Sequence, residues 1–166
     1  LHGVEIFASF SEGELKALAE RLVHAPFARG DVITRQGMVA HWLYILVAGE
    51  AEVWLEQQGG RRLLTTLPAG NVFGEMGMLT GEPRRATVTA KSDVECYRLD
   101  KAGFEEVIRS RPAIAEEMAA ILTERNMQLA TAQEALGAEA HARERLRQHA
   151  SLLGKMRSFF RLGEAK

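Results

Sequence analysis

The stretch that decides the fold runs from Asn71 to Val88 and reads NVFGEMGMLTGEPRRATV. Two of its glycines, Gly74 and Gly77, would let the backbone approach a ligand closely, because glycine has no Cβ. A helical turn that starts here would direct unpaired N–H groups and a partial positive charge outward. This half of the stretch therefore predicts a site for an anion.

The other half of the stretch supplies side chains that suit a sugar phosphate. Arg84 or Arg85 would provide a guanidinium that binds two phosphate oxygens at once. Glu75 would accept hydrogen bonds from sugar hydroxyls. A surface loop with solvated charges explains the same pattern, so the residue chemistry alone leaves both interpretations open.

Around this stretch, short apolar runs are separated by glycines, which indicates short strands joined by turns. The clearest hairpin has Gln58-Gly59-Gly60 at its turn. Turn signals recur at intervals of roughly eight to twelve residues, which favours an antiparallel sandwich or barrel. Among the expected strands are residues 51–56, 61–67, 86–90 and 94–100.

Helices are expected before and after these strands. Ser11 and Glu14 form the S-x-x-E pattern of a capping box, which predicts a first helix over residues 11–23. After the strands, a short helix should end before Pro112 and a longer one should begin there. The predicted fold is α+β and mainly β: an eight-stranded antiparallel jelly roll with one N-terminal helix and two or three C-terminal helices.

The C-terminal part is predicted to form helices with narrow apolar seams and a basic tail. Residues from Ala138 onward carry a local net charge of +4, in a chain whose formal net charge is −1. We expect residues 1–136 to form one domain, with the roll at about 24–100 and lid helices at 101–136, and residues 137–166 to form a basic amphipathic helical tail. The seam expected in the tail contains Ala142, Leu146, His149, Leu153, Met156 and Phe160. Such a seam favours pairing with a second copy of the chain over contact with a membrane surface.

Composition limits the class of protein. The 166 residues include 46% hydrophobic and 26% charged side chains, which is typical of one globular domain with at most an appendage. No apolar run approaches the roughly 20 residues of a membrane-spanning helix. The single cysteine, Cys96, excludes an internal disulfide and fits a reducing compartment. The first residue is not Met, so we expect a piece of a longer chain that is cytoplasmic or is the cytosolic part of a membrane protein.

The run FGEMGMLTGEPRRATV, residues 73–88, resembles the phosphate-binding cassette of the cyclic-nucleotide-binding family. That family includes kinase regulatory subunits, gated channels and the catabolite activator protein. The resemblance covers about residues 7–129 and extends to RGDVI at residues 29–33, LYILVAGE at residues 43–50, and Gly70. It implies a sensor domain that binds a cyclic nucleotide and has no catalytic activity of its own.

The resemblance also implies roles for individual residues. The backbone N–H groups of Gly74 and Met76 would approach the ligand, Glu75 would bind the ribose 2′-hydroxyl, and Arg84 would bind the cyclic phosphate. Arg85 stands where the family often has Ser, Thr or Ala, and a hydroxyl there is associated with guanine recognition. We therefore expect cAMP rather than cGMP as the ligand. The candidate ligand-binding residues are Phe73, Gly74, Glu75, Met76, Arg84, Arg85, Ala86, Thr87 and Arg125.

Two arginines have alternative interpretations. Arg85 either points to solvent, which we favour, or makes a second phosphate contact. Arg125 falls where a related bacterial potassium channel has an arginine on its lid helix, which implies that it stacks on the purine. It could equally pair with a glutamate in a helix dimer. Ligand binding would pull the lid helices against the cassette, and this movement would be the output.

The end of the chain bears on the effector. LLGKMRSFFRL, residues 152–162, is similar to the C-terminus of bacterial channels that join a mechanosensitive-type pore to a cyclic-nucleotide domain. A channel pore is therefore the expected effector. The sequence after Gly137 is too short for a winged helix-turn-helix, so no nucleic-acid partner is expected.

Two other functions remain as alternatives. One is a domain of the same fold that binds no ligand and serves in assembly. The other is a metal-dependent cupin enzyme, which shares the roll but needs clustered histidines. The five histidines are scattered along the chain, so we expect no metal site and no enzymatic activity. They are His2, His24, His41, His141 and His149.

Overall fold

The computed structural model describes the backbone of residues 4–131 and 138–162, and the side chains of residues 4–124 and 142–162. In chain order its elements are a 3-10 helix at Glu5–Phe7, α1 (Glu12–Ala19), β1 (Val23–Phe27), β2 (Val32–Thr34), β3 (Trp42–Ala48), β4 (Ala51–Gln57), β5 (Gly60–Leu67), β6 (Val72–Phe73), α2 (Glu75–Thr80), β7 (Thr87–Ala90), β8 (Val94–Asp100), α3 (Lys101–Ser110), α4 (Ala113–Thr131) and α5 (Ala138–Phe160).

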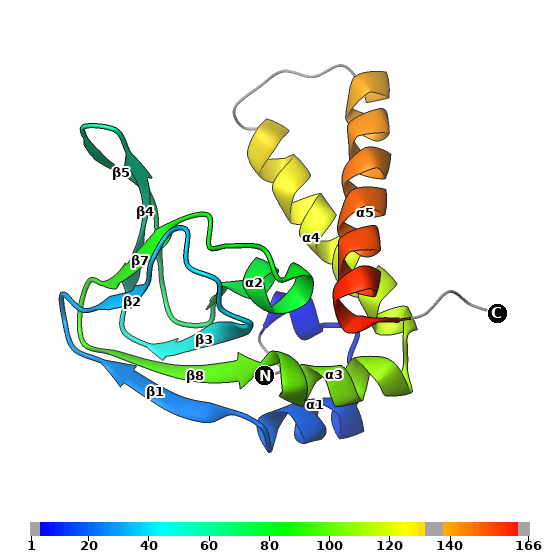
Figure 1. Cartoon of the computed structure of the whole chain (residues 1–166), viewed down its shortest axis with the longest axis horizontal. Helices are drawn as coiled ribbons and strands as arrows, with labels where there is room; N and C mark the ends of the chain where they lie inside the picture. The colour runs from blue at the N-terminus through cyan, green and yellow to red at the C-terminus, as the bar shows by residue number, and fades with distance from the viewer. Residues whose placement is uncertain (1–3, 132–137, 163–166) are drawn as a thin grey trace.

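The strands of the described part form two four-stranded antiparallel sheets (Figure 1). Their orders are β1-β8-β3-β6 and β2-β7-β4-β5. Most strands pair with strands that are distant in the sequence. Within residues 4–131 and 138–162, only β4 and β5 form a simple hairpin, with Gly59 at φ 88° in its turn. This arrangement confirms the predicted jelly roll with an N-terminal helix and C-terminal helices.

One apolar core fills the roll between its two sheets. Along β8, Val94 and Cys96 are buried while Glu95 between them is exposed, which is the alternation of a strand with one face inward. The Tyr44 and Phe73 rings stack inside the roll with centroids 5.1 Å apart. Burial raises the pKa of the Cys96 thiol to about 11, so this cysteine is a core residue rather than a reactive one.

A second apolar core joins the roll to the helices, which gather on one side of it (Figure 1). Leu43 of β3 and Leu99 of β8 are fully buried there against the helices, together with Leu18 of α1 and Phe104 of α3. Helix α3 follows β8 without a loop, so the helical core is directly continuous with the roll.

The first helix begins as predicted and ends earlier. Ser11 accepts a hydrogen bond from the Glu14 N–H and Glu14 accepts one from the Ser11 N–H, so the capping box is present. Helix α1 ends at Ala19 rather than at residue 23. Val23 instead begins β1 and pairs with Arg98 of β8, because the backbone gains its hydrogen bonds from the sheet there.

Helix α5 packs back onto α4 and α2 and contributes to the helical core. Its buried side chains are Leu152, Met156 and Phe160, spaced four residues apart. Of the predicted seam residues, Met156 and Phe160 are buried within this chain, whereas Leu146 is exposed, with an exposed fraction of 71%. The buried face of α5 differs from the predicted seam because contacts with α4 and α2 of the same chain determine it. Pairing of the tail with a second copy, and the domain boundary after residue 136, stay predictions.

Acidification is expected to remove an ion-pair network that ties α1 to the start of α4. Arg111 donates to Glu14 at 2.8 and 3.0 Å and to Glu117 at 2.8 and 3.0 Å. The Arg111 guanidinium lowers the pKa of Glu14 from 4.5 to about 2. A lowered pKa stabilises the fold above the ordinary pKa and the effect is lost on acidification, here between about pH 5 and about pH 2.

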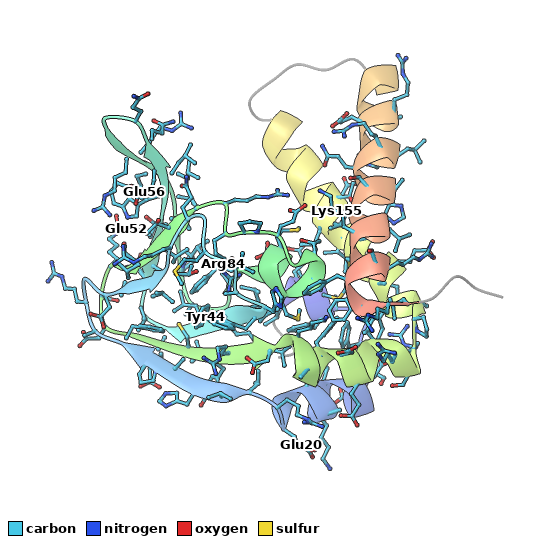
Figure 2. All side chains as sticks on the ribbon, in the orientation of Figure 1. Glu20, Tyr44, Glu52, Glu56, Arg84 and Lys155 are labelled. Carbon is cyan, nitrogen blue, oxygen red and sulfur yellow. The ribbon has the colours of Figure 1, made fainter. Side chains whose placement is uncertain are left out.

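Glu14→Gln should therefore cost roughly 1–2 kcal/mol of unfolding free energy at pH 7 and flatten the pH dependence in that window. Denaturant unfolding between pH 3 and pH 7 measures both. Glu20→Gln is the control, since Glu20 is exposed beside the end of α1 (Figure 2). Equal pH dependence in both variants would show that the Arg111 network contributes nothing to stability.

Candidate functional site

The stretch at residues 71–88 forms β6, the short helix α2 and the start of β7. Gly74 has φ 77° and Gly81 has φ 75°, so both occupy the left-handed region that glycine adopts without strain. These two glycines bound α2 on either side and let the chain reverse direction at both of its ends. We call residues 73–87 the cassette.

Arg84 is the buried centre of the cassette, with an exposed fraction of 5%. Its Nη1 donates to the Gly74 carbonyl oxygen at 2.5 Å and its Nη2 donates to the Trp42 carbonyl oxygen at 2.6 Å. The guanidinium therefore connects the start of α2 to β3, and Figure 2 shows it between α2 and the strands of the roll.

The glycines of the cassette make room for this guanidinium. A Cβ on Gly74 would lie 2.5 Å from Arg84 Nη1, and one on Gly77 would lie 2.6 Å from the same atom and 2.5 Å from the Ala40 carbonyl oxygen. Close approach to a ligand was the predicted reason for both glycines. The structure adds a second cause, which is the side chain of Arg84 packed against both glycines.

The environment of Arg84 leaves its charge short of partners. Burial lowers the pKa of Arg84, while Tyr44 and Glu75 act in the opposite direction. An arginine still keeps its proton in a protein, so the cation persists at the cost of its lost hydration. The buried Nε has no hydrogen-bond partner among the described residues. An anion bound beside this group would offset that cost.

A cavity of about 250 Å³ opens onto the Arg84 side chain. Of the predicted ligand-binding residues, it is lined by Phe73, Gly74, Glu75, Met76, Arg84, Arg85 and Ala86. The residues that sequence reasoning did not include are Thr34, Val53, Val72, Gly77, Pro83 and Val88. Val88 could have been found from its alternation with Ala86, whereas Thr34 and Val53 reach the cavity only through the pairing of β2 and β4 with β7.

Thr87 does not line this cavity; its hydroxyl oxygen accepts a hydrogen bond from the Gln36 N–H at 3.0 Å. Arg85 is exposed and donates to Glu82 at 2.8 Å. Arg125 lies in α4, and its side chain falls outside the described residues, so both of its proposed roles stay predictions.

The C-terminal helix contacts the cassette directly. Lys155 Nζ lies 2.6 Å from Glu82 Oε1, and a Cβ on Gly81 would lie 2.5 Å from the Phe159 ring. The Phe159 ring also lies edge-on to His41, with centroids 4.9 Å apart. Helix α5 is therefore positioned to respond to a change in the residues just before Arg84.

Within residues 4–131 and 138–162, no three side chains of the His, Cys, Asp or Glu type come together in a metal-binding group. In the same ranges, no helix has the length and apolar character needed to cross a membrane.

Comparison with known protein families matches residues 25–111, just over half of the chain, to the family described as "Cyclic nucleotide-binding domain". The chain belongs to this family. The matched segment includes all of the cassette and the strands that form the cavity. Membership decides against the cupin alternative, which rested on the shared roll alone.

Individual relatives of this cyclic-nucleotide-binding domain match only part of their own length. The chain is 36% identical over 109 residues to a cAMP-dependent protein kinase regulatory subunit from Blastocladiella emersonii, which covers 65% of this chain and 27% of that protein. It is 27% identical over 121 residues to a CRP-like cAMP-activated global transcriptional regulator of Mycobacterium tuberculosis, covering 72% and 54%.

Among solved structures, the catabolite activator protein of Thermus thermophilus aligns with a TM-score of 0.68 at 26% identity, covering 78% of this chain and 61% of that one. The chain thus spans between about a quarter and about a half of these two curated relatives.

Proposed function

We propose that this domain binds a cyclic nucleotide, with cAMP preferred over cGMP, and passes binding on as a movement of its C-terminal helices. The observation that carries the proposal is the buried Arg84 guanidinium, which lines the cavity and keeps an unpaired Nε. A cyclic phosphate is a small monoanion that a guanidinium binds through two oxygens. Glu75 lines the same cavity and would accept from the ribose hydroxyl.

The preference for cAMP rests on two supports. Position 85 carries an exposed arginine instead of the hydroxyl associated with guanine recognition. The relatives named above are described as cAMP-dependent and cAMP-activated proteins. The domain would act in regulation rather than in catalysis, as the names of those relatives indicate.

The movement would pass through the contacts between α5 and the cassette. Phosphate binding at Arg84 would pull on residues 82 and 83, which are adjacent in sequence. Glu82 forms an ion pair with Lys155 of α5, so a displacement of Glu82 would also move α5. Amide hydrogen exchange in α5 should therefore change when the nucleotide is added.

The effector is a separate question. A channel pore was predicted from the end of the chain and stays a prediction, since the relatives described above are a kinase regulatory subunit, a transcriptional regulator and a catabolite activator protein rather than channels. The expectation of no nucleic-acid partner also stays a prediction. The nucleotide-binding proposal depends on neither.

Calorimetric titration with cAMP and with cGMP, after removal of any carried-over nucleotide, tests the proposed ligand. We expect one site per chain and binding of cAMP that is tighter by about tenfold, or about 1.4 kcal/mol. A tighter cGMP complex would contradict the base preference. Binding of neither nucleotide would leave a ligand-free scaffold and overturn the proposal.

A further inference from the structure

The cavity beside Arg84 has walls of two kinds. The Arg84 guanidinium is anchored to α2 and to β3, through the carbonyl oxygens of Gly74 and Trp42. Another part of the wall comes from the second sheet, in which β2, β7 and β4 are neighbouring strands (Figure 1). A nucleotide whose phosphate binds Arg84 therefore has this sheet, within the same cavity, for the rest of the molecule.

Three residues of this sheet form a row along the cavity wall. Val88 of β7 pairs with Thr34 of β2 and with Val53 of β4, and all three line the cavity. Residues that pair across neighbouring strands point to the same face of a sheet. The two valines thus give an apolar surface, and Thr34 ends the row because β2 is the edge strand.

This row matches the polarity of a purine base. The faces of a base are apolar enough to pack on protein side chains, while its ring nitrogens and exocyclic groups lie along its edges. A base whose face rests on Val53 and Val88 would present an edge to Thr34. The row therefore offers a polar partner where the base needs one.

The Thr34 hydroxyl is accessible for such a contact. Among the described strand residues that line the cavity, Thr34 alone has a polar side chain. It is half-buried, and its hydroxyl has no hydrogen-bond partner in the described part of the chain. The oxygen is not one of the unpartnered polar atoms that are fully enclosed, so a ligand in the cavity can reach it. A hydroxyl both donates and accepts, which suits either a ring nitrogen or an amino group.

We propose that Thr34 is a specificity-determining residue of this cavity. Its hydroxyl forms a hydrogen bond with an edge atom of the purine, while Val53 and Val88 pack against the face of the base. This inference rests on the proposed nucleotide-binding function. It adds base recognition by the second sheet, which does not depend on the lid helices or on Arg125.

The test is calorimetric titration of the full chain with cAMP. Thr34→Val keeps the β-branched shape and loses only the hydroxyl, so it should weaken cAMP binding by about fivefold, the effect of one hydrogen bond between neutral groups. Thr34→Ser keeps the hydroxyl and should stay within about twofold of the parent. Thermal unfolding should be the same for the parent and Thr34→Val, because no hydrogen bond within the chain is lost.

A matched control removes a hydroxyl from the same sheet outside the cavity. Thr66 of β5 pairs with Glu52, the chain neighbour of Val53, and it does not line the cavity. Successive residues of a strand point to opposite faces, so Thr66 faces away from the row. Thr66→Val should therefore change the affinity for cAMP by less than about 1.5-fold.

Two analogues of cAMP test whether the hydroxyl contacts the base. The 3′,5′-cyclic phosphate of benzimidazole riboside keeps the shape of the base but lacks the nitrogens of the six-membered ring and the amino group. The 7-deaza analogue of cAMP lacks the remaining edge nitrogen. We expect the fivefold difference between the parent and Thr34→Val to shrink or vanish with the analogue that lacks the contacted atom.

Three results would overturn the role of Thr34. They are unchanged cAMP binding in Thr34→Val, equal weakening by Thr66→Val, and a fivefold difference that persists with both analogues, which would assign the hydroxyl to the sugar or the phosphate. Each of these is measured with a parent chain that binds cAMP, so the proposed function would stand. A parent chain that bound no cyclic nucleotide would instead overturn the proposed function and this inference with it.

Discussion

Arg84→Ala is expected to weaken cyclic-nucleotide binding by about 100-fold or more. The substitution removes a buried guanidinium that lines the cavity, and charge-assisted bidentate bonds to phosphate contribute about 3 kcal/mol or more when desolvated. Arg84→Lys should restore little of the affinity, because an ammonium cannot make the paired contacts of the fork. Calorimetric titration with cAMP measures both variants.

Arg84 also bonds the Gly74 and Trp42 carbonyl oxygens, so its loss affects folding as well. Circular dichroism and thermal unfolding of each variant therefore accompany the titration. Arg85→Ala is the matched control, since it removes the same charge from the next residue, which is exposed and paired with Glu82. We expect its affinity to stay within about threefold of the parent. If Arg85→Ala lost cAMP binding while a folded Arg84→Ala variant kept it, Arg85 rather than Arg84 would be the residue that binds the phosphate.

Gly49→Ala should destabilise the fold by roughly 3 kcal/mol, which is the largest stability effect we expect from one added methyl group. Gly49 has φ 84°, in the turn between β3 and β4. A Cβ there would overlap with the Asp93 carbonyl oxygen and would lie 2.9 Å from a Val94 methyl group. The clash is with backbone, so it cannot be relieved by a rotamer change.

Gly30→Ala separates the two causes of this effect. Gly30 has φ 89°, but nothing lies within 4 Å of a Cβ built there. It should therefore show only the cost of the left-handed backbone, about 1–2 kcal/mol. Denaturant unfolding compares the two variants. Equal losses would mean that the turn at Gly49 relaxes away from Asp93, and that the close packing of β3 against the loop before β8 contributes nothing.

Elements with strong local signals were predicted closely. Strand β8 was expected over residues 94–100 and occupies Val94–Asp100, while the hairpin around Gly59 lies where its glycines indicated. Helix α3 ends at Ser110, shortly before Pro112. Capping, turn and proline effects act through the backbone over a few residues, so the sequence carries them directly.

The candidate site was predicted in part. Seven cassette residues of the nine predicted line the cavity, because they are contiguous or nearly so in the chain. Thr34 and Val53 were missed because only the sheet pairing brings them there. The role of Gly74 and Gly77 in accommodating Arg84 was missed for the same reason, since it depends on where a distant guanidinium packs.

The sequence by itself indicated short antiparallel strands between helices and located the cassette with its arginines, because glycine, proline and apolar periodicity act locally. Only the tertiary structure decided which face of α5 is buried and that Lys155 meets Glu82. Helical periodicity marks an apolar stripe but not its partner. The burial of Leu152 and the exposure of Leu146 follow from packing against α2 and α4, which no local pattern encodes.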